Sequence, residues 1–512
     1  MTQSSIESQR RPGLWRFANQ QKPRQQAVID IGSNSVRLIV YQINGRSVVP
    51  RINEKVMAGL GENLQETGNL SPKGVEATLK AMSRFMAICS SLGVSDITAI
   101  ATAATRDAKD GPELCRKIEH MSGQKVRVLS GEEEAHYAAL GVVSAQRDPT
   151  GLIGDLGGSS LELIVTDKGH LTSGKTYKLG PLALEHHPSQ SLSKLTSHVK
   201  DVLAAQGRIP KVERFYAVGG AWRAIAALHM ELKDYPLRVL QSYSAPAQEI
   251  IDLCDQVSDL KRRPDDLLKS VSSKRAGTLH LTALTLKCAL QACKAKTFVT
   301  SAYGLREGLV YAGMDQETQQ IDPLFAGVAI LARSNQRQVS FSRALQNTLS
   351  PILSELEPVF QSDPRMDNRL HEAAFILADI GAVMHPDHRS DIARQLVLRG
   401  PYTGIEHPGR VYLGLITGTR YYRKFPIGEL ETQVLTPEQI ERAKTVALLI
   451  RVAAEFSGRT ERILKRATLS VQGGNLVLSV LPKHAALISE GVVKRLGHAA
   501  SHMGLEPQIA YD

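Results

Sequence analysis

Two short segments of the sequence place an aspartate, glycines and serines in a tight turn directly after an apolar strand. In the first segment the candidate phosphate-binding residues are Asp30, Gly32, Ser33, Asn34 and Ser35. After Asp155, they are Gly157, Gly158, Ser159 and Ser160. Glycine lets the backbone approach a ligand closely, so that successive N–H groups can point at phosphate oxygens, and Asp30 is aimed into the first turn. A tight β-turn without a ligand would explain either segment alone.

The two segments are copies of one unit, which favours phosphate binding over two unrelated turns. Between Asp30 and Val40, six of eleven positions are identical to those 125 residues later. A repeated strand–turn–strand unit predicts two similar α/β halves. Such halves, facing each other, would form a cleft of the kind in which ligands commonly bind.

Carboxylates at the ends of these strands suit a divalent cation. In the second copy Glu162 stands where the first copy has Arg37, so that Asp155 and Glu162 form a carboxylate pair. Carboxylates cannot bind phosphate directly, but they can hold Mg²⁺ or its waters. The pair is therefore the candidate metal site.

Three consecutive glutamates follow a predicted helix start at Ser130. Ser130 and Glu133 have the spacing of a capping box, which predicts that Glu133 stabilises the helix locally. A carboxylate at the mouth of a phosphate cleft is a candidate general base for water. Spacing alone leaves Glu132, Glu133 and Glu134 as alternatives. We expect His136 to be an exposed helix residue.

Two further features could contact phosphate groups. Arg106 lies in a loop after a strand, where an arginine can brace a transferring phosphoryl group or form a surface ion pair. Gly219 and Gly220 open a helix, and a helix N-terminus accepts anions well. Paired glycines at a turn are otherwise structural.

These residues require at least two α/β lobes to position them. The pattern predicts a flexible basic tail over residues 1–26, a first lobe over 27–137 and a second lobe over 138–316. Residues 317–512 lack strands between their apolar helical runs and predict a separate, mostly helical domain. Near its end we expect a hairpin across Gly473 and Gly474, followed by a last helix.

Composition narrows the class of protein. The chain has 512 residues, 62 Lys and Arg against 51 Asp and Glu, and a formal charge of +11. Its 42% hydrophobic and 22% charged residues exclude a mostly disordered, collagenous or coiled-coil protein. The basic excess favours polyanionic partners. We expect no membrane span and no secretory signal, and five scattered cysteines predict a cytoplasmic protein with free thiols.

Taken in order, seven segments resemble the motifs of the exopolyphosphatase / guanosine pentaphosphate phosphohydrolase family. They are VIDIGSNSVRL, ATAATRDA, LSGEEEAHYAALGV, GDLGGSSLEL, LGPL, YAVGGAWRAIA and GLREGLVY, and together they cover about residues 27–316. The resemblance implies an α/β fold of duplicated actin-like lobes, similar to ribonuclease H, sugar kinases and heat-shock ATPases. That fold agrees with the internal repeat.

The resemblance also implies an activity. Members of the family use Mg²⁺ and an activated water to remove a terminal phosphate from inorganic polyphosphate or from guanosine pentaphosphate. The glutamate immediately before the alanine of the family motif S-G-x-E-E-A corresponds to Glu134, the implied catalytic base. The implied loop arginine is Arg106, and the acidic residues of the second turn correspond to Asp155 and Glu162. Ser159 stands where the family has a third glycine. We expect no nucleic-acid partner, and we expect the protein to form a homodimer.

The C-terminal region resembles the HD phosphohydrolases less closely. Residues 376–381 are similar to the HD motif, but Ala378 occupies the place of its metal-binding histidine. Loss of one ligand should cripple such a metal site. We therefore expect this domain to be a remnant of that fold, used for substrate binding or dimerisation.

Several functions are compatible with these motifs. An exopolyphosphatase leads, and hydrolysis of guanosine pentaphosphate is the alternative; the basic surplus favours the long polyanion. An ATP-dependent kinase-like protein should show an adenosine pocket after the Gly219–Gly220 turn, and none is evident. A non-catalytic sensor of guanosine polyphosphates is disfavoured by the intact acidic residues.

Overall fold

The computed structural model describes residues 23–189, 191–260, 276–332, 336–360 and 365–511. The tail expected over residues 1–26 lies outside these ranges, except for its last residues. There the expectation is wrong, because strand β1 (Arg24–Ile31) begins at Arg24, which pairs with Ile43. The chain divides into two compact units between Pro323 and Leu324.

The division between the units comes slightly later than the expected boundary at residues 316 and 317. Helix α13 (Gln316–Gln319) and the segment after it belong to the first unit. Arg46 holds them there, since its guanidinium donates to the carbonyl oxygens of Gln319 and Ile321 (2.9 Å to Ile321).

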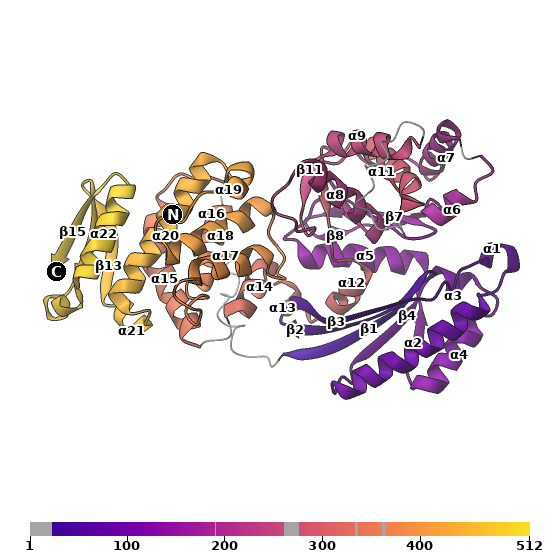
Figure 1. Ribbon diagram of the computed structural model, residues 1–512, viewed down its shortest axis with the longest axis horizontal. Coiled ribbons are helices and arrows are strands. Elements are labelled where there is room, and N and C mark those ends of the chain that lie inside the picture. The colour runs from indigo at the N-terminus through magenta and orange to yellow at the C-terminus, as the bar shows by residue number, and fades with distance from the viewer. Residues whose placement is uncertain (1–22, 190, 261–275, 333–335, 361–364, 512) are drawn as a thin grey trace, which may run out of the picture. The chain divides into compact units, whose positions relative to one another are not determined.

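The first lobe is a five-stranded sheet in the order β3-β2-β1-β4-β5 (Figure 1). Its other strands are β2 (Ser35–Asn44), β3 (Ser47–Met57), β4 (Ile97–Ala101) and β5 (Val126–Val128), and its helices are α1 (Leu64–Thr67), α2 (Pro72–Ser91), α3 (Ala103–Asp107) and α4 (Gly111–Ser122). Apolar residues alternate between the faces of β1. Ile29 packs with Phe85 of α2, whereas Val28 packs with Val143 and Val310 on the opposite face.

The second lobe repeats this plan in a seven-stranded sheet with the order β11-β12-β10-β6-β7-β8, and β9 also pairs with β7. Its strands are β6 (Gly151–Leu156), β7 (Leu161–Asp167), β8 (His170–Leu171), β9 (Lys175–Tyr177), β10 (Arg214–Val218), β11 (Ser244–Pro246) and β12 (Thr297–Thr300). Its described helices are α6 (Pro181–Glu185), α7 (Leu192–Ala205), α8 (Gly220–Leu232), α9 (Ala247–Ser258) and α11 (Leu279–Cys293). Each lobe thus starts with an antiparallel hairpin and continues with parallel strands, which is the duplication that the repeat predicted.

Helix α5 (Gly131–Ala145) lies between the two sheets and crosses α12 (Leu305–Ala312) (Figure 1). The predicted lobe boundary at residues 137 and 138 falls inside α5, which continues without a break. Glycines allow the crossing: a Cβ atom at Gly308 would lie 1.7 Å from the carbonyl oxygen of Tyr137, and one at Gly141 would lie 2.2 Å from that of Gly304. The two helices therefore pack backbone against backbone.

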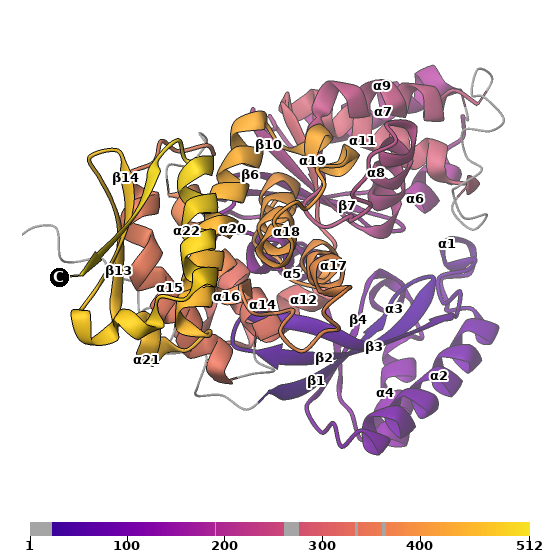
Figure 2. The same cartoon turned by 60° about the vertical axis from the view of Figure 1, so that its left-hand side comes forward.

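The second unit is mostly helical, as predicted. Its helices are α14 (Pro323–Ala332), α15 (Gln336–Ser354), α16 (Met366–Leu377), α17 (Arg389–Arg399), α18 (His407–Tyr421), α19 (Glu429–Val434), α20 (Pro437–Ser457), α21 (Glu461–Leu464), η2 (Pro482–Leu487) and α22 (Glu490–His502). The predicted hairpin joins β13 (Ala467–Gln472) to β14 (Asn475–Val480), and Gly473 and Gly474 both have positive φ. A third strand, β15 (Glu506–Tyr511), pairs in parallel with β14 and was not predicted (Figure 2).

Two further expectations can be compared with the described residues. None of the helices in these ranges is both long enough and apolar enough to cross a membrane. All five cysteines are buried free thiols.

Candidate active site

The two duplicated turns have the same backbone construction. In the first lobe the N–H of Gly32 donates to the carbonyl of Ser35 (3.1 Å), and in the second the N–H of Gly157 donates to the carbonyl of Ser160 (2.9 Å). Equivalent hydrogen bonds close both turns at the ends of equivalent strands. Ser159, in place of the family's third glycine, is accommodated without loss of this bond.

The middle of each turn presents backbone N–H groups that donate to no protein group within the described ranges. These are the amides of Ser33 and Asn34 in the first turn, and of Gly158 and Ser159 in the second. Each turn is anchored by its neighbours: the N–H of Gly61 donates to the carbonyl of Ser33 (2.8 Å), and that of Leu182 donates to the carbonyl of Gly158 (2.9 Å). Fixed loops with open amides are suited to anions.

The predicted glycine pair at the start of a helix lies beside the second turn. Gly219 precedes α8 with φ 96°, and a Cβ atom there would lie 2.7 Å from the carbonyl oxygen of Leu156 and 3.1 Å from an Oδ of Asp155. Only glycine fits this approach comfortably. Gly220 is the first residue of α8, so the N-terminus of that helix begins next to the Asp155 carboxylate.

The structure separates the three candidate glutamates at the start of α5. Glu133 forms the predicted capping box with Ser130 and an ion pair with Arg127. Glu132 is exposed. Glu134, by contrast, is largely buried, with 18% of its side chain exposed, and pairs with Arg106. Of the three, Glu134 is therefore the one that contacts another predicted site residue and whose pKa is affected by Asp155 and Asp30.

Arg106 lies on the short helix α3 and not in the expected loop, and it holds Glu134 in place. One Nη of Arg106 donates both to Glu134 and to the carbonyl of Leu129 (2.8 Å), and its Nε lies 3.3 Å from an Oδ of Asp107. Two thirds of the side chain is buried, so this is more than an isolated surface ion pair. A guanidinium with remaining N–H groups at this position can also face a phosphate oxygen.

Four carboxyl groups from both lobes influence one another's pKa values. Burial raises the pKa of Glu134 to about 7, although Arg106 opposes this, and the charges of Asp155 and Asp30 raise it further. Burial raises the pKa of Asp155 to about 6. Burial and the neighbouring charge of Asp155 raise that of Glu162 to about 8. This mutual influence indicates that the predicted residues of the two lobes face one site.

Sequence reasoning missed three arginines that complete the site. A guanidinium nitrogen of Arg306 lies 3.5 Å from a carboxylate oxygen of Asp30, and the positive charge of Arg306 also lowers the pKa of Asp155. The positive charge of Arg223 likewise lowers the pKa of Asp155. The third arginine, Arg37, lies opposite Asp30 in the pairing of β1 with β2. The sequence did offer a signal for each of them. Arg223 lies three residues after Gly220 at the start of a helix, Arg306 lies two residues after Gly304, and Arg37 occupies the position in the first copy of the repeat that Glu162 occupies in the second.

A buried network fixes Arg306. The adjacent Glu307 accepts a hydrogen bond from the hydroxyl of Tyr41 on β2, and its other oxygen accepts one from the N–H of Gly304 (2.9 Å). Because Tyr41 belongs to the first lobe's sheet and Glu307 to α12, the network holds Arg306 close to the first turn.

The arrangement supplies what phosphoryl transfer to water requires. It combines open amides, guanidinium groups and a carboxylate whose pKa lies near neutrality, and such a carboxylate is suited to general base catalysis. No group of three His, Cys, Asp or Glu side chains in the described part of the chain could hold a metal ion alone. Asp155 and Glu162 nevertheless fit Mg²⁺, which usually binds one or two carboxylates together with substrate phosphates and water.

In the helical unit, the aspartate of the HD-like motif forms ion pairs with arginines. Asp379 is buried and forms ion pairs with Arg337 and Arg459, each at 3.2 Å. Ala378 leaves no histidine beside it. Two cations thus pair with the carboxylate that occupies the position of the metal-binding aspartate in the HD motif.

The chain is similar to known proteins along most of its length. The model of the Ppx/GppA phosphatase family matches residues 39–317, and that of the exopolyphosphatase C-terminal domain matches residues 357–508. Exopolyphosphatase 1 of Mycobacterium bovis is 24% identical over 57% of this chain and 88% of its own. A guanosine-5′-triphosphate,3′-diphosphate pyrophosphatase of Photobacterium profundum is 25% identical over 69% of this chain and 72% of its own.

Two other relatives extend the comparison. Retrograde regulation protein 2 of Saccharomyces cerevisiae is 24% identical over 78% of this chain and 73% of its own. Among solved structures, that of the Aquifex aeolicus member of the Ppx/GppA protein family has a TM-score of 0.52 and 23% identity, covering 56% of this chain and 97% of that one. The structural likeness shows the shared fold.

Proposed function

The chain belongs to the Ppx/GppA phosphatase family, and from this premise we propose that it is an exopolyphosphatase that releases orthophosphate from the end of inorganic polyphosphate. The single observation that carries the proposal is the position of Glu134. It is mostly buried, paired with Arg106, and electrostatically coupled to the aspartates of both turns. A carboxylate so placed is suited to deprotonating a water beside a bound phosphate.

In the proposed reaction the turns bind and orient the terminal phosphate. The amides of Ser33 and Ser159, with Arg106 and Arg306, offset charge on its non-bridging oxygens. Glu134 takes a proton from a water as the water oxygen bonds to the terminal phosphorus. The bridging P–O bond breaks, and the shortened chain leaves with the bond's electron pair. Asp155 and Glu162 would hold Mg²⁺, whose chemistry there is to neutralise part of the phosphate charge.

A cluster of cations in the helical unit supports a long polyanion as the substrate. A cavity of about 390 Å³, formed by residues of α18, α20, α22 and the turn after α18, is lined by Arg423, Lys424, Lys444 and His498. The charges of Arg451 and Lys494 also reach this cavity, since both lower the pKa of His498. Burial and the charge of Arg495 lower the pKa of Arg451 to about 10. The hydroxyl of Thr419, which lines the cavity, is buried and finds no hydrogen-bond partner within the described ranges. Lys444 is paired with Glu441 (2.7 Å), but cations outnumber acids here, and a surplus of positive charge attracts phosphate-rich chains.

Guanosine pentaphosphate hydrolysis is the second candidate, supported by the Photobacterium relative. The decisive experiment measures phosphate release from long polyphosphate and from guanosine pentaphosphate side by side, with Mg²⁺ and with a chelator. We expect faster release from polyphosphate. Faster release from the nucleotide would reverse the order of the two candidates.

The role of Glu134 is tested within the same assay. Glu134→Gln should bind polyphosphate but turn it over ~10²–10⁴-fold more slowly, because the amide cannot accept the proton from water. Glu132→Gln, on the same helix turn but exposed, is the matched control and should retain activity. Near-normal turnover in Glu134→Gln would refute the assignment. Binding without turnover in the unmodified protein would instead favour a non-catalytic sensor; the name of the yeast relative refers to regulation.

The contribution of the cation cluster is tested by salt. Binding of a long polyanion should weaken steeply with ionic strength because many charges are engaged. Arg423→Glu with Lys424→Glu should raise the KM for long polyphosphate and flatten its salt dependence. Lys483→Glu, an exposed lysine elsewhere in the unit, is the control. If both variants behave alike, the cluster does not contact the substrate.

A further inference from the structure

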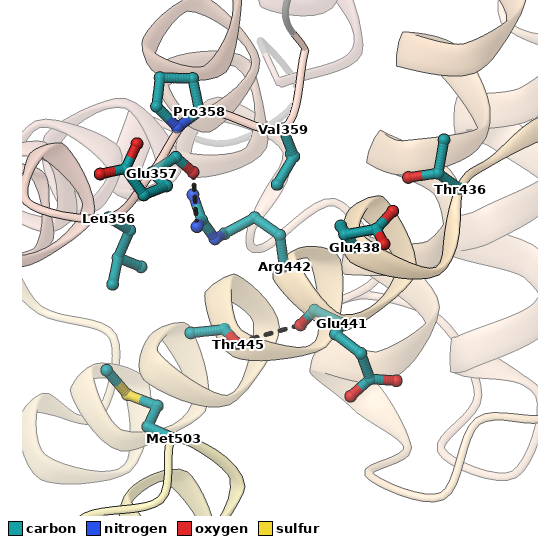
Figure 3. A pocket seen from close by; sticks show the side chains of 10 residues that line it. All are labelled: Leu356, Glu357, Pro358, Val359, Thr436, Glu438, Glu441, Arg442, Thr445 and Met503. Atoms are coloured by element: carbon teal, nitrogen blue, oxygen red, sulfur yellow. Dashed lines mark hydrogen bonds between the residues drawn. The ribbon is translucent and has the colours of Figure 1, made fainter.

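A groove with an apolar wall and an acidic rim lies in the helical unit (Figure 3). Its volume is about 740 Å³, and it is formed by residues 356–359 after α15, by the first half of α20 and by Met503 at the end of α22. None of the residues assigned to catalysis lines it, and neither does any cation that lines the basic cavity.

The apolar wall of the groove is open to solvent. Leu356, Val359 and Met503 are each only partly buried, and Pro358 is exposed. Their apolar surface can therefore be covered by another segment, unlike the surface of side chains already packed in a core. A concave site with such a wall is suited to apolar side chains.

The rim of the groove carries negative charge that no cation balances. Glu357 and Glu438 are exposed, and neither forms an ion pair within the part of the chain that the structure describes. Glu441 contributes less, because it is paired with Lys444 (2.7 Å). Two unpaired carboxylates favour a partner with positive charge.

Arg442 adds a fixed cation to the lining, between the wall and the rim (Figure 3). One Nη donates to the carbonyl of Glu357 (2.8 Å), and the other lies 3.9 Å from an Oδ of Asp367. This second Nη is buried and has no hydrogen-bond acceptor among the described residues. A guanidinium held in this way attracts the negative face of an aromatic ring.

The sequence that precedes β1 has the complementary chemistry. Residues 10–17 read Arg-Arg-Pro-Gly-Leu-Trp-Arg-Phe, with three cations, no acid and three large apolar side chains. Trp15 and Phe17 are the only aromatic residues of the sequence outside the described ranges. Because water disfavours contact with aromatic surface, these two rings are stabilised by an apolar wall.

Other occupants fit the groove less well. The polyanion of the proposed function would be repelled by Glu357 and Glu438. Residues 261–275 also lie outside the described ranges, but they contain no aromatic residue and include Asp265 and Asp266. Residues 10–17 alone among these segments combine aromatic rings with an excess of cations.

We propose that this groove binds residues 10–17 of the same chain, with their aromatic rings on the apolar wall and their arginines at Glu357 and Glu438. Residues 18–23 join this segment to β1. A segment tethered in this way has an effective concentration on the order of millimolar where its linker spans the distance. The inference is independent of the proposed function, since no residue assigned to catalysis takes part.

The chain's two tryptophans, Trp15 and Trp222, make a direct test possible. Fluorine NMR of the full chain labelled with 5-fluorotryptophan gives one signal for each, and Trp15→Phe identifies the signal of Trp15. Trp222 is fully buried, so its signal is the reference for a protected ring. A soluble nitroxide should broaden the signal of Trp15 far less than that of free 5-fluorotryptophan.

Charge reversal at the rim should release the segment. Glu357→Lys with Glu438→Lys should lower the ratio of protected to exposed Trp15 about tenfold or more, because attraction to the arginines becomes repulsion. Asp387→Lys with Glu506→Lys is the matched control, since both acids are exposed in the same unit and neither lines the groove. The control should leave the ratio unchanged.

Three results of these measurements would overturn the proposal. The first is a signal of Trp15 that the nitroxide broadens as fully as that of the free amino acid. The second is equal protection in both charge-reversed variants, which would place Trp15 on another surface. The third is protection that disappears on dilution, which would show that a second copy of the chain supplies the segment.

Hydrogen exchange provides a test that leaves the groove itself unaltered, should the charge-reversed variant fail to fold. Residues 356–359 should exchange at least about threefold faster in Trp15→Ala with Phe17→Ala than in the unmodified chain, because the contact that shields them is lost. Gln20→Ala with Gln21→Ala, two polar positions nearby in the sequence, should not change the rate. Equal exchange in all three proteins would contradict docking in this groove.

Discussion

At the residue scale, the site is built from carboxyl groups held in an environment that disfavours their charged forms. Glu134, Asp155 and Glu162 are each desolvated and each lies near another acid. Arg106 and Arg306 offset this in part by pairing with Glu134 and Asp30. Such an arrangement lowers the free energy of unfolding, but it also gives a carboxylate whose pKa lies near neutrality, as a general base requires.

The pH dependence of turnover should follow Glu134. Because its pKa is raised to about 7 and a general base acts in its deprotonated form, the rate should rise with pH through about 7 and then level off. Arg106 lowers that pKa, so Arg106→Gln should move the midpoint to higher pH besides slowing the reaction. A pH–rate profile of kcat/KM checks both. A midpoint that stays fixed or falls in Arg106→Gln would contradict the assignment.

Glu162 should reduce the stability of the folded chain. Its folded pKa, about 8, lies above the ordinary value of 4.5, so between these pH values the unfolded chain releases the proton while the folded chain keeps it, and the stability of the fold falls as the pH rises from 4.5 to about 8. Glu162→Gln removes that charge and should stabilise the chain by about 1–3 kcal/mol at pH 8 in the absence of divalent ions, while abolishing activity.

The matched control for this prediction is Glu133, whose pKa is instead lowered by its hydrogen bonds to Ser130 and by Arg127. Glu133→Gln should cost about 0.5–1 kcal/mol, because it weakens the helix cap and an ion pair. Thermal unfolding at pH 8 measures both variants. Equal destabilisation by the two would show that Glu162 carries no such penalty.

Residue types and spacing identified much of the site, but not its pairings. The repeat located Asp30, Asp155 and both turns, since local turn chemistry follows from local sequence. Spacing left the three glutamates equivalent, and the structure distinguishes them by neighbours that are distant in sequence. Arg306 was missed for the same reason: its partner is Asp30, and only the folded topology brings the two together.

At the scale of elements, helix α5 is held in position by contacts with both lobes. It packs against both sheets, it starts with the capping box of Ser130, and Glu134 lies in its first turn. Arg46 fixes its other end, donating to the carbonyls of Val143 (2.7 Å) and Ser144 (3.3 Å). A helix fixed at both ends holds a catalytic side chain accurately.

The crossing of α5 with α12 should tolerate no side chain. Gly308→Ala would put a methyl group 1.7 Å from the carbonyl oxygen of Tyr137, so the helices would have to separate. We expect a loss of about 3 kcal/mol or more and little activity. Gly313→Ala, at the end of α12, is the control, since its nearest neighbour is 3.6 Å away. Urea unfolding compares the two, and equal stabilities would contradict the close packing.

The elements that sequence predicted best are those with local signals. The hairpin across Gly473 and Gly474 follows from two glycines able to adopt positive φ. Strand β15 was missed because Glu506–Tyr511 is largely exposed and begins next to a proline, so it has neither alternation nor an apolar core. Its existence depends on pairing with β14, which is a tertiary effect.

At the scale of the whole molecule, two units with different chemistry share one chain. The unit that ends at Pro323 contains the open amides and the perturbed carboxyls, and the unit from Leu324 onward contains an HD-like core without a metal site in its described residues. There Asp379 joins elements far apart in sequence through Arg337 and Arg459. The helical unit therefore depends on ion pairs where HD enzymes use a metal.

This difference predicts how the helical unit responds to two treatments. A chelator should leave its unfolding temperature unchanged. Asp379→Asn, in contrast, removes the buried negative charge that both arginines pair with and should destabilise the unit by about 1–3 kcal/mol. Asp387→Asn, an exposed aspartate, should have little effect. Calorimetry of the three proteins with and without chelator checks this. A transition that shifts with chelator alone would indicate a metal site after all.

The twin turns match in construction but differ in charge at one equivalent position, where Arg37 lies opposite Asp30 and Glu162 opposite Asp155. A symmetric pair would grip the middle of a phosphate strand as readily as its tip. Because one turn has an arginine where the other has a glutamate, a phosphate chain bound between them would have one preferred orientation. The proposed reaction starts at a free chain end, which a ring lacks, so this protein should not degrade cyclic metaphosphates until another reaction opens the ring.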